Sequence, residues 1–85
     1  MPHIADKHVL WTEKNGIVTV QLLATGAFFE LNSLGSIVWK LLASGKSVDA
    51  AIESMAKTYD VTREQLALDV HAFVVKMIAA GLLEA

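Results

Sequence analysis

Apolar and polar residues alternate in the first third of the chain with the period of two that is typical of β-strands. Residues 9–12 form a short run of β-prone side chains, and residues 17–23 form a longer run rich in β-branched residues. Asn15 and Gly16 lie between the two runs, and this pair is preferred in type I′ turns because both positions need a positive φ. The pattern therefore predicts an antiparallel hairpin.

A third strand is predicted at residues 27–31, after a second turn at Thr25 and Gly26. Within this strand Phe29 and Leu31 share one face, which should pack on the core. The sheet is then an antiparallel meander of three strands, and no further strand is predicted after it. Because the last strand would have an unpaired edge, we expect that edge to be able to pair with another chain.

The hydrophobic period changes to about 3.6 residues from Asn32 onward, which predicts three consecutive helices. Asn32 should cap the first helix, Ser33–Ala43, and Gly45 lies where a left-handed C-terminal cap is expected. Ser47 should cap the second helix, Val48–Thr58. Gly35 is expected to be a close-packing position, and the apolar face of the first helix should bury Leu34, Ile37, Val38, Leu41 and Leu42.

The third helix is predicted over residues 63–80, the longest regular segment of the chain. Thr62 and Gln65 have the spacing of a capping box, in which the hydroxyl bonds forward and the glutamine amide reaches back. Gly81 should end the helix. Leu82 and Leu83 should then fold back on the core.

Two opposite faces of this third helix are apolar. The ordinary core face carries Leu66, Val70, Phe73, Val74 and Met77. The far side, where an exposed helix usually carries charges, has Leu68, Ala72, Val75 and Ala79, and Asp69 and Lys76 form one narrow polar flank. Because a domain of this size can hardly bury a whole helix, we expect part of it to line a site for a partner. The pattern leaves open which face does so.

The chain of 85 residues is expected to form a single domain, residues 1–85, of the α+β class. Hydrophobic residues make up 54% of it and the mean hydropathy is +0.48, which fits either a large ordinary core or an apolar groove that a partner covers. The 7 basic and 9 acidic residues are scattered singly and give a net charge of −2. Because no basic stripe could follow a phosphate backbone, we expect no nucleic-acid partner.

The sequence carries little that could support a reaction. No cysteine is present, and His3, His8 and His71 lack the spacing of a metal site, with His3 expected in a frayed terminus and His8 in an edge strand. No segment has the length of a signal peptide or of a membrane span. We therefore expect a cytoplasmic protein with no membrane partner, no catalytic residues, no metal and no cofactor, and we expect that it is not an enzyme.

The order of these features resembles the PqqD-like family, which includes the peptide chaperone of pyrroloquinoline quinone biosynthesis and the RiPP recognition elements. The resemblance covers nearly the whole chain, from Val9 to Glu84. The matching segments are Phe29-Glu30-Leu31-Asn32, Gly35, Ile37-Val38-Trp39, Leu41-Leu42, Ser47-Val48-Asp49, Ile52, Tyr59-Asp60-Val61, Asp69-Val70, Phe73-Val74 and Gly81-Leu82-Leu83.

The resemblance implies a winged helix-turn-helix-like fold, with a three-stranded antiparallel sheet followed by three helices. It also implies binding of the leader segment of a ribosomally synthesised precursor peptide, which would add as a strand to the third strand and lie beside the third helix. The implied leader-binding residues are Ala27, Phe28, Phe29, Glu30, Leu31, Leu66, Asp69, Val70, Phe73, Val74, Val75 and Met77. The other implied partner is a leader-processing enzyme of the same pathway, and the protein would be a monomer or a weak homodimer.

Standalone family members of this size resemble either the quinone-pathway chaperone or the leader-binding subunit of lasso-peptide systems. The hairpin with Asn15 and Gly16 and the short N-terminal segment favour the lasso-peptide type. Two other functions remain open. A winged-helix DNA-binding module is disfavoured because the third helix sets only two cations against two carboxylates, and the second alternative is a structural module that dimerises through its open edge.

Overall fold

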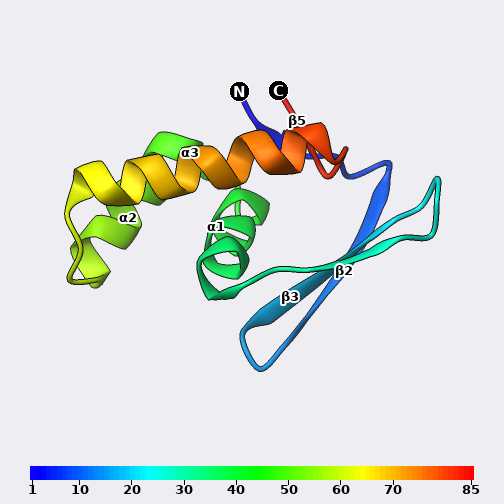
Figure 1. The fold of residues 1–85 in the computed structure, drawn as a ribbon, viewed down its shortest axis with the longest axis horizontal. Helices are drawn as coiled ribbons and strands as arrows, with labels where there is room; N and C mark the ends of the chain where they lie inside the picture. The colour runs from blue at the N-terminus through cyan, green and yellow to red at the C-terminus, as the bar shows by residue number, and fades with distance from the viewer.

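A computed structural model describes residues 1–85 and shows five strands and three helices (Figure 1). In chain order these are β1 (His3–Ile4), β2 (Val9–Lys14), β3 (Ile17–Leu22), β4 (Phe28–Glu30), α1 (Ser33–Ala43), α2 (Val48–Thr58), α3 (Arg63–Ala79) and β5 (Leu83–Glu84). The α+β class and the sequence of three sheet strands followed by three helices are confirmed, with element ends that differ from the prediction by one or two residues.

The main sheet is an antiparallel meander with the order β2-β3-β4, as predicted. Asn15 and Gly16 both have positive φ, 53° and 83°, which confirms the hairpin turn between β2 and β3. Val18 and Val20 of β3 are fully buried on the inner face of the sheet. Both β2 and β4 are edge strands, so the predicted open edge on the third strand of the meander is present.

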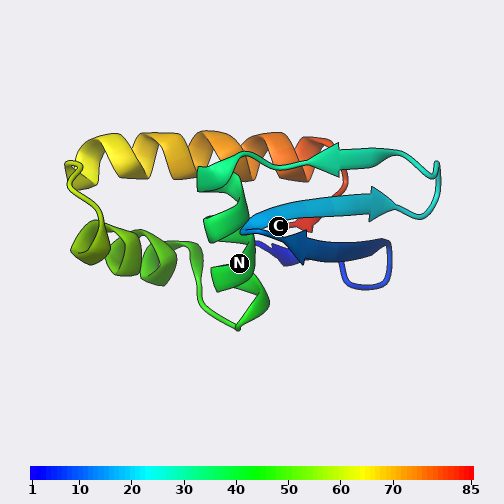
Figure 2. The same cartoon turned by 90° about the horizontal axis from the view of Figure 1, so that it is seen from below.

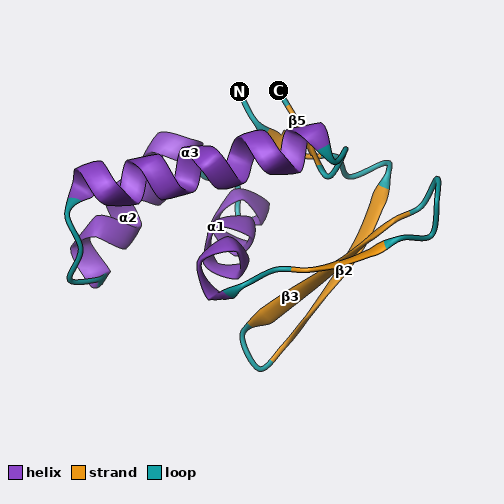
Figure 3. Ribbon diagram, in the orientation of Figure 1, coloured by secondary structure: helices purple, strands orange, loops and turns teal.

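α1 lies between the sheet and the α2–α3 pair, as Figures 2 and 3 show. It packs against β3 on one side and against α2 and α3 on the other, which makes it the centre of the fold. Trp39 and Val38 of α1 are fully buried there. The ring of Trp11 from β2 packs edge-on against that of Trp39, with 6.1 Å between the ring centroids. The core is therefore built around α1.

The predicted N-caps of α1 and α2 are confirmed. The Asn32 Oδ1 atom accepts a hydrogen bond of 2.8 Å from the Gly35 N–H, and the Ser47 Oγ atom accepts one of 3.0 Å from the Ala50 N–H. Gly45 has a φ of 96°, as expected for a left-handed position after α1. These local hydrogen bonds set where each helix begins and therefore which face it turns to the core.

Only half of the capping box at α3 is formed. Thr62 Oγ1 accepts a hydrogen bond of 3.2 Å from the Gln65 N–H, as predicted. The glutamine side chain does not return to Thr62; its Nε2 atom donates to Asp69 Oδ1 at 3.0 Å, one helical turn further on. The carboxylate is a charged acceptor, so it competes well for this amide group.

The prediction of a frayed N-terminus is wrong. β1 pairs antiparallel with β5, with His3 opposite Glu84 and Ile4 opposite Leu83. The physical reason is burial, since Ile4 is 5% exposed and Leu82 and Leu83 fold back on the core as expected. His8 belongs to the turn before β2 rather than to an edge strand.

The burial pattern of the helices also differs in part from the prediction. Val38 and Leu42 of α1 are buried, whereas Leu34, Ile37 and Leu41 are only half-buried. α3 is two-faced as expected, because its outward residues Leu68 and Val75 remain 68% and 67% exposed. None of the three helices combines the length and the apolar character that crossing a membrane would require.

Candidate functional site

The free edge of β4 presents unpaired backbone groups. The Leu22 N–H donates to the Ala27 carbonyl and the Leu31 N–H donates to the Val18 carbonyl, both at 2.9 Å. Backbone groups of successive residues in an antiparallel strand point to opposite sides. The backbone groups of Phe28 and Glu30 therefore point away from β3, toward the open edge.

The side chains of β4 alternate as predicted. Phe28 is 69% exposed and Glu30 is also exposed, on the outer face of the sheet. Phe29 is half-buried and Leu31 is 5% exposed, and both pack on the core. Phe29 and Leu31 therefore anchor β4 to the core, while the hydrogen-bonding groups on the outward edge of the strand remain free.

Ser36 fixes the point where β4 turns into α1. Its hydroxyl accepts a hydrogen bond of 2.9 Å from the Val18 N–H and donates one of 3.4 Å to the Leu31 carbonyl. It is the one polar side chain in the buried set, with 0% exposure. The hydroxyl thus continues the β3–β4 pairing where the chain has already left the strand. Sequence reasoning missed this role because a serine near a helix start is usually a cap.

A first cavity of about 360 Å³ lies between the end of β4 and the middle of α3. It is lined by Asn32, Leu34, Asp69, Ala72, Phe73 and Lys76. Gly35 packs against the Phe73 ring that lines this cavity, since a Cβ atom at position 35 would lie 2.6 Å from the Phe73 Cε1 atom. The predicted close packing at Gly35 is confirmed, and it lets the Phe73 ring lie against α1.

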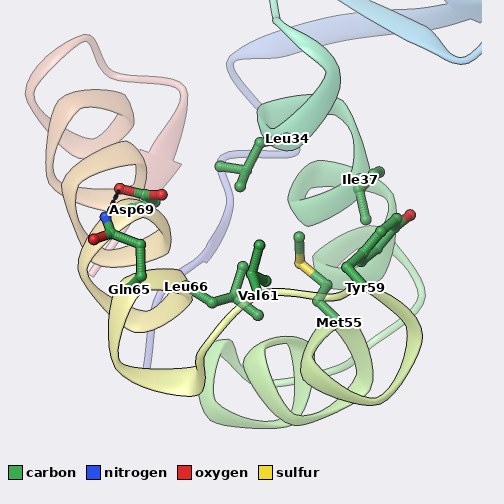
Figure 4. A pocket seen from close by; sticks show the side chains of 8 residues that line it. All are labelled: Leu34, Ile37, Met55, Tyr59, Val61, Gln65, Leu66 and Asp69. Atoms are coloured by element: carbon green, nitrogen blue, oxygen red, sulfur yellow. Dashed lines mark hydrogen bonds between the residues drawn. The ribbon is translucent and has the colours of Figure 1, made fainter.

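A second cavity of about 240 Å³ continues the first between α1, the end of α2 and the start of α3 (Figure 4). Six of its eight lining residues are hydrophobic; the full set is Leu34, Ile37, Met55, Tyr59, Val61, Gln65, Leu66 and Asp69. The hydrogen-bonded pair of Gln65 and Asp69 forms its polar rim (Figure 4). Because both cavities share Leu34 and Asp69, we refer to them together as the α1–α3 groove.

The structure brings some of the predicted site residues together and separates others. Ala27, Phe28, Phe29, Glu30 and Leu31 form or flank the β4 edge, while Leu66, Asp69 and Phe73 line the α1–α3 groove. Val70, Val74 and Met77 are core side chains, at most 5% exposed, and they line neither cavity of the groove; their contact with a ligand stays a prediction. Val75 lies on the outward face of α3, opposite the core, and its contact with a ligand also stays a prediction.

Several residues of the groove were not predicted. They come from four places: the first half of α1 with its cap, the end of α2, the polar flank of α3, and the loop between α2 and α3. Tyr59 and Val61 of that loop are 44% and 49% exposed, and two large apolar side chains in so short a polar linker are a signal that the sequence does contain. The other unpredicted lining residues are Asn32, Leu34, Ile37, Met55, Gln65, Ala72 and Lys76.

The groove offers apolar side chains and a short polar flank for binding. Asp69 and Lys76 are its charged residues, both on the exposed flank of α3. No group of three or more histidine, cysteine, aspartate or glutamate side chains is arranged to hold a metal ion. An open strand edge that leads into an apolar groove can bind an extended segment by backbone pairing and side-chain burial.

Comparisons with known proteins identify the family of this chain and two structures with a similar fold. The family described as "Coenzyme PQQ synthesis protein D (PqqD)" matches residues 12–83. The solved structure "TbiB1 in Complex with the TbiA(beta) Leader Peptide" is 29% identical, with a TM-score of 0.92 over 98% of this chain and 95% of that chain. "Lasso peptide synthetase B1 complexed with the leader peptide" is 15% identical, with a TM-score of 0.88 over 99% and 98%, and shares the fold. No curated protein sequence matches the chain.

Proposed function

Because this chain belongs to the PqqD family, we propose that it binds the leader segment of a ribosomally synthesised precursor peptide and presents that peptide to a processing enzyme. The observation that carries this proposal is the open edge of β4, whose free backbone groups lead into the apolar α1–α3 groove. TbiB1, which is similar over nearly its whole length, is bound to a leader peptide and supports the same role here.

The first part of the mechanism is strand addition at β4. Phe28 and Glu30 together offer two N–H and two C=O groups to an extended peptide. A hydrogen bond of this kind contributes about 1 kcal/mol net, so the edge supplies a few kcal/mol without reading the peptide's side chains. Affinity from this source is therefore almost independent of sequence.

The second part is recognition of side chains in the α1–α3 groove. A peptide that continues past the end of β4 meets Phe73 and Leu34 in the first cavity, and then the apolar walls of the second cavity. Fully burying one large apolar side chain contributes about 1.5–3 kcal/mol. The groove therefore favours leaders with apolar residues beyond the strand-forming segment. Glu30 and Asp69 can each meet a basic leader residue in a partly screened pair.

The protein acts in this proposal without a catalytic step of its own. Holding the leader raises the effective concentration of the attached core peptide at a leader-processing enzyme that binds the same complex. We assign the pathway to the lasso-peptide type. The N-terminal hairpin of the sequence and the shared fold with lasso peptide synthetase B1 support this choice over the quinone pathway.

The strand-addition step can be tested with two proline variants. The probe is the fluorescein-labelled TbiA(beta) leader peptide, the ligand of the similar protein TbiB1. Phe28→Pro removes an outward N–H from β4, and Glu13→Pro removes the corresponding outward N–H from β2 at the other edge of the sheet. Proline is tolerated at such unpaired edge positions, so both variants should keep the fold.

We expect Phe28→Pro to weaken binding about tenfold or more. The substitution removes the N–H donor, and the proline ring obstructs the pairing of the peptide with the edge. Glu13→Pro should bind like the wild type. Fluorescence anisotropy measures the affinity, and circular dichroism checks the fold. Equal binding by both variants, or a loss confined to Glu13→Pro, would refute strand addition at β4.

A further inference from the structure

The outward face of α3 carries an apolar stripe, of which only Ala72 also belongs to the groove of the proposed function. The stripe consists of Leu68, Ala72, Val75 and Ala79, which are all exposed. Leu68 and Val75 are 68% and 67% exposed, among the highest values for large apolar side chains in the chain. The spacing of four, three and four residues is the seam by which two helices pack against each other.

No part of the chain covers this stripe. α3 packs against α1, α2 and β5, and these contacts use its inward residues Leu66, Val70, Val74 and Met77. Over eleven residue steps the stripe is about 16 Å long at 1.5 Å per residue. Its centre lies on the side of the helix opposite to the core, so it is open to another helix along its whole length.

The stripe is complementary to a second copy of itself in antiparallel orientation. Large and small residues alternate along it, with Leu68 and Val75 large and Ala72 and Ala79 small. When two such helices pair about a twofold axis near residues 73 and 74, Leu68 lies opposite Ala79 of the second copy and Val75 opposite Ala72 of the second copy. Each large side chain then fills the space left by a small one.

The charges beside the stripe fit the same arrangement. Asp69 and Lys76 lie on one flank, seven residues apart, and Lys76 has no ion-pair partner within the chain. In the antiparallel register, Asp69 and Lys76 of the second copy are offset by only about 3 Å along the helix axis. The twofold axis repeats this pair, so two complementary ion pairs flank the apolar seam. The two Asp69 side chains, and likewise the two Lys76 side chains, are more than twice as far apart along the axis as Asp69 is from Lys76 of the second copy.

We propose that this protein self-associates through α3, as an isologous antiparallel dimer in which the stripe packs against the stripe of a second copy. One helix face covers much less than the roughly 800 Å² per partner of a stable interface, so the dimer is weak and forms at high protein concentration. Ala72 also lines the α1–α3 groove, which places the second copy at the border of the groove.

Cysteine cross-linking tests the register, because the chain has no cysteine of its own. Ala72→Cys and Val75→Cys each lie close to the twofold axis, and either variant alone should form a disulfide-linked dimer under mild oxidation. Leu68→Cys and Ala79→Cys lie about 16 Å from their own copies along the axis, so each alone should remain monomeric. An equal mixture of these two variants should cross-link. Cross-linking of Leu68→Cys by itself would indicate a parallel pair and overturn the proposal.

Sedimentation of the cysteine-free chain from about 10 to 500 μM tests the surface itself, in the concentration range of weak complexes. Leu68→Glu should weaken self-association tenfold or more, and Asp69→Lys should also weaken it, with rescue by the exchange Asp69→Lys with Lys76→Asp. The matched control is Leu10→Glu, at a residue of β2 that is 60% exposed, which should leave self-association unchanged. A monomer at all concentrations, or an association that only Leu10→Glu abolishes, would refute the proposal.

Discussion

Replacing Ser36 with alanine is expected to destabilise the fold at the junction that holds the β4 edge. The serine hydroxyl accepts the Val18 N–H at 2.9 Å and donates to the Leu31 carbonyl at 3.4 Å. Both backbone residues are buried, with 0% and 5% exposure, so water cannot replace the lost hydroxyl without entering the core. The substitution removes one oxygen atom and leaves a buried N–H without an acceptor.

The magnitude follows from which groups lose their partners. A buried, unsatisfied hydrogen-bonding group costs about 1–3 kcal/mol, and the Val18 N–H carries most of this cost because its bond is the shorter one. The long bond to the Leu31 carbonyl adds little, and the missing oxygen leaves only a small cavity. We therefore expect a loss of about 2 kcal/mol, which corresponds to a fall in Tm of about 8–16 °C for a domain of this size.

Urea unfolding followed by tryptophan fluorescence measures this loss, with an unchanged m value as the sign that only stability has changed. Ser44→Ala is the matched control. Its hydroxyl also donates to a backbone carbonyl, that of Leu41 at 2.7 Å, but it is exposed and water can take its place. The control should change stability by about 0.5 kcal/mol or less.

Equal urea midpoints of Ser36→Ala and Ser44→Ala would refute the expected loss of about 2 kcal/mol. That result would mean that the Val18 N–H pairs directly with the Leu31 carbonyl once the hydroxyl is gone. A second readout is leader affinity, which should fall in Ser36→Ala because the end of β4 is no longer fixed.

Three further predictions concern the core, the groove and the kind of force that holds the leader. Trp39→Ala should lower the free energy of unfolding in urea by about 3–5 kcal/mol, because the ring is fully buried. Trp39→Phe should lower it less, since the Trp39 Nε1 atom has no acceptor to lose. Equal losses in the two variants would contradict this expectation. Gly35→Ala places a Cβ atom 2.6 Å from the Phe73 ring, so it should push the ring toward the groove and weaken leader binding several-fold, as measured by anisotropy. The control is Gly45→Ala, at a φ of 96° with open space around it. It should lower stability by about 1 kcal/mol and leave leader affinity unchanged. Leader affinity should vary little between about 50 and 200 mM salt, because backbone pairing and apolar burial dominate; a loss of orders of magnitude would show an electrostatic site instead.

The features that the sequence determined by itself depend on residues close to one another in the chain. The turn at Asn15 and Gly16 follows from backbone preferences, and the caps at Asn32 and Ser47 follow from a side-chain oxygen three residues before its donor. The two apolar faces of α3 follow from its period of 3.6 residues. Each of these is fixed locally, so each could be predicted before any packing was known.

The extent of burial of each residue within a predicted helix face could not be derived from the sequence. Helical periodicity assigns a residue to a face, but how much of that face is covered depends on the neighbouring elements. Val70 and Phe73 both belong to the predicted core face of α3, yet Val70 is fully buried and Phe73 is only half-buried. Leu34 and Ile37 were expected in the core and instead line the groove. The groove exists only because α1, α3 and the loop with Tyr59 meet around it, and no local pattern specifies that meeting.

Tertiary structure alone decided the contacts between distant residues. His3 lies opposite Glu84, at the two ends of the chain, because burying Ile4 and Leu83 together compensates for ordering both termini. The Ser36 hydroxyl bridges two segments that the sequence places thirteen residues apart, and a serine carries no sign of which backbone groups it will meet. Long-range pairing of this kind depends on where whole elements are placed, and that placement is set by the packing of the entire core.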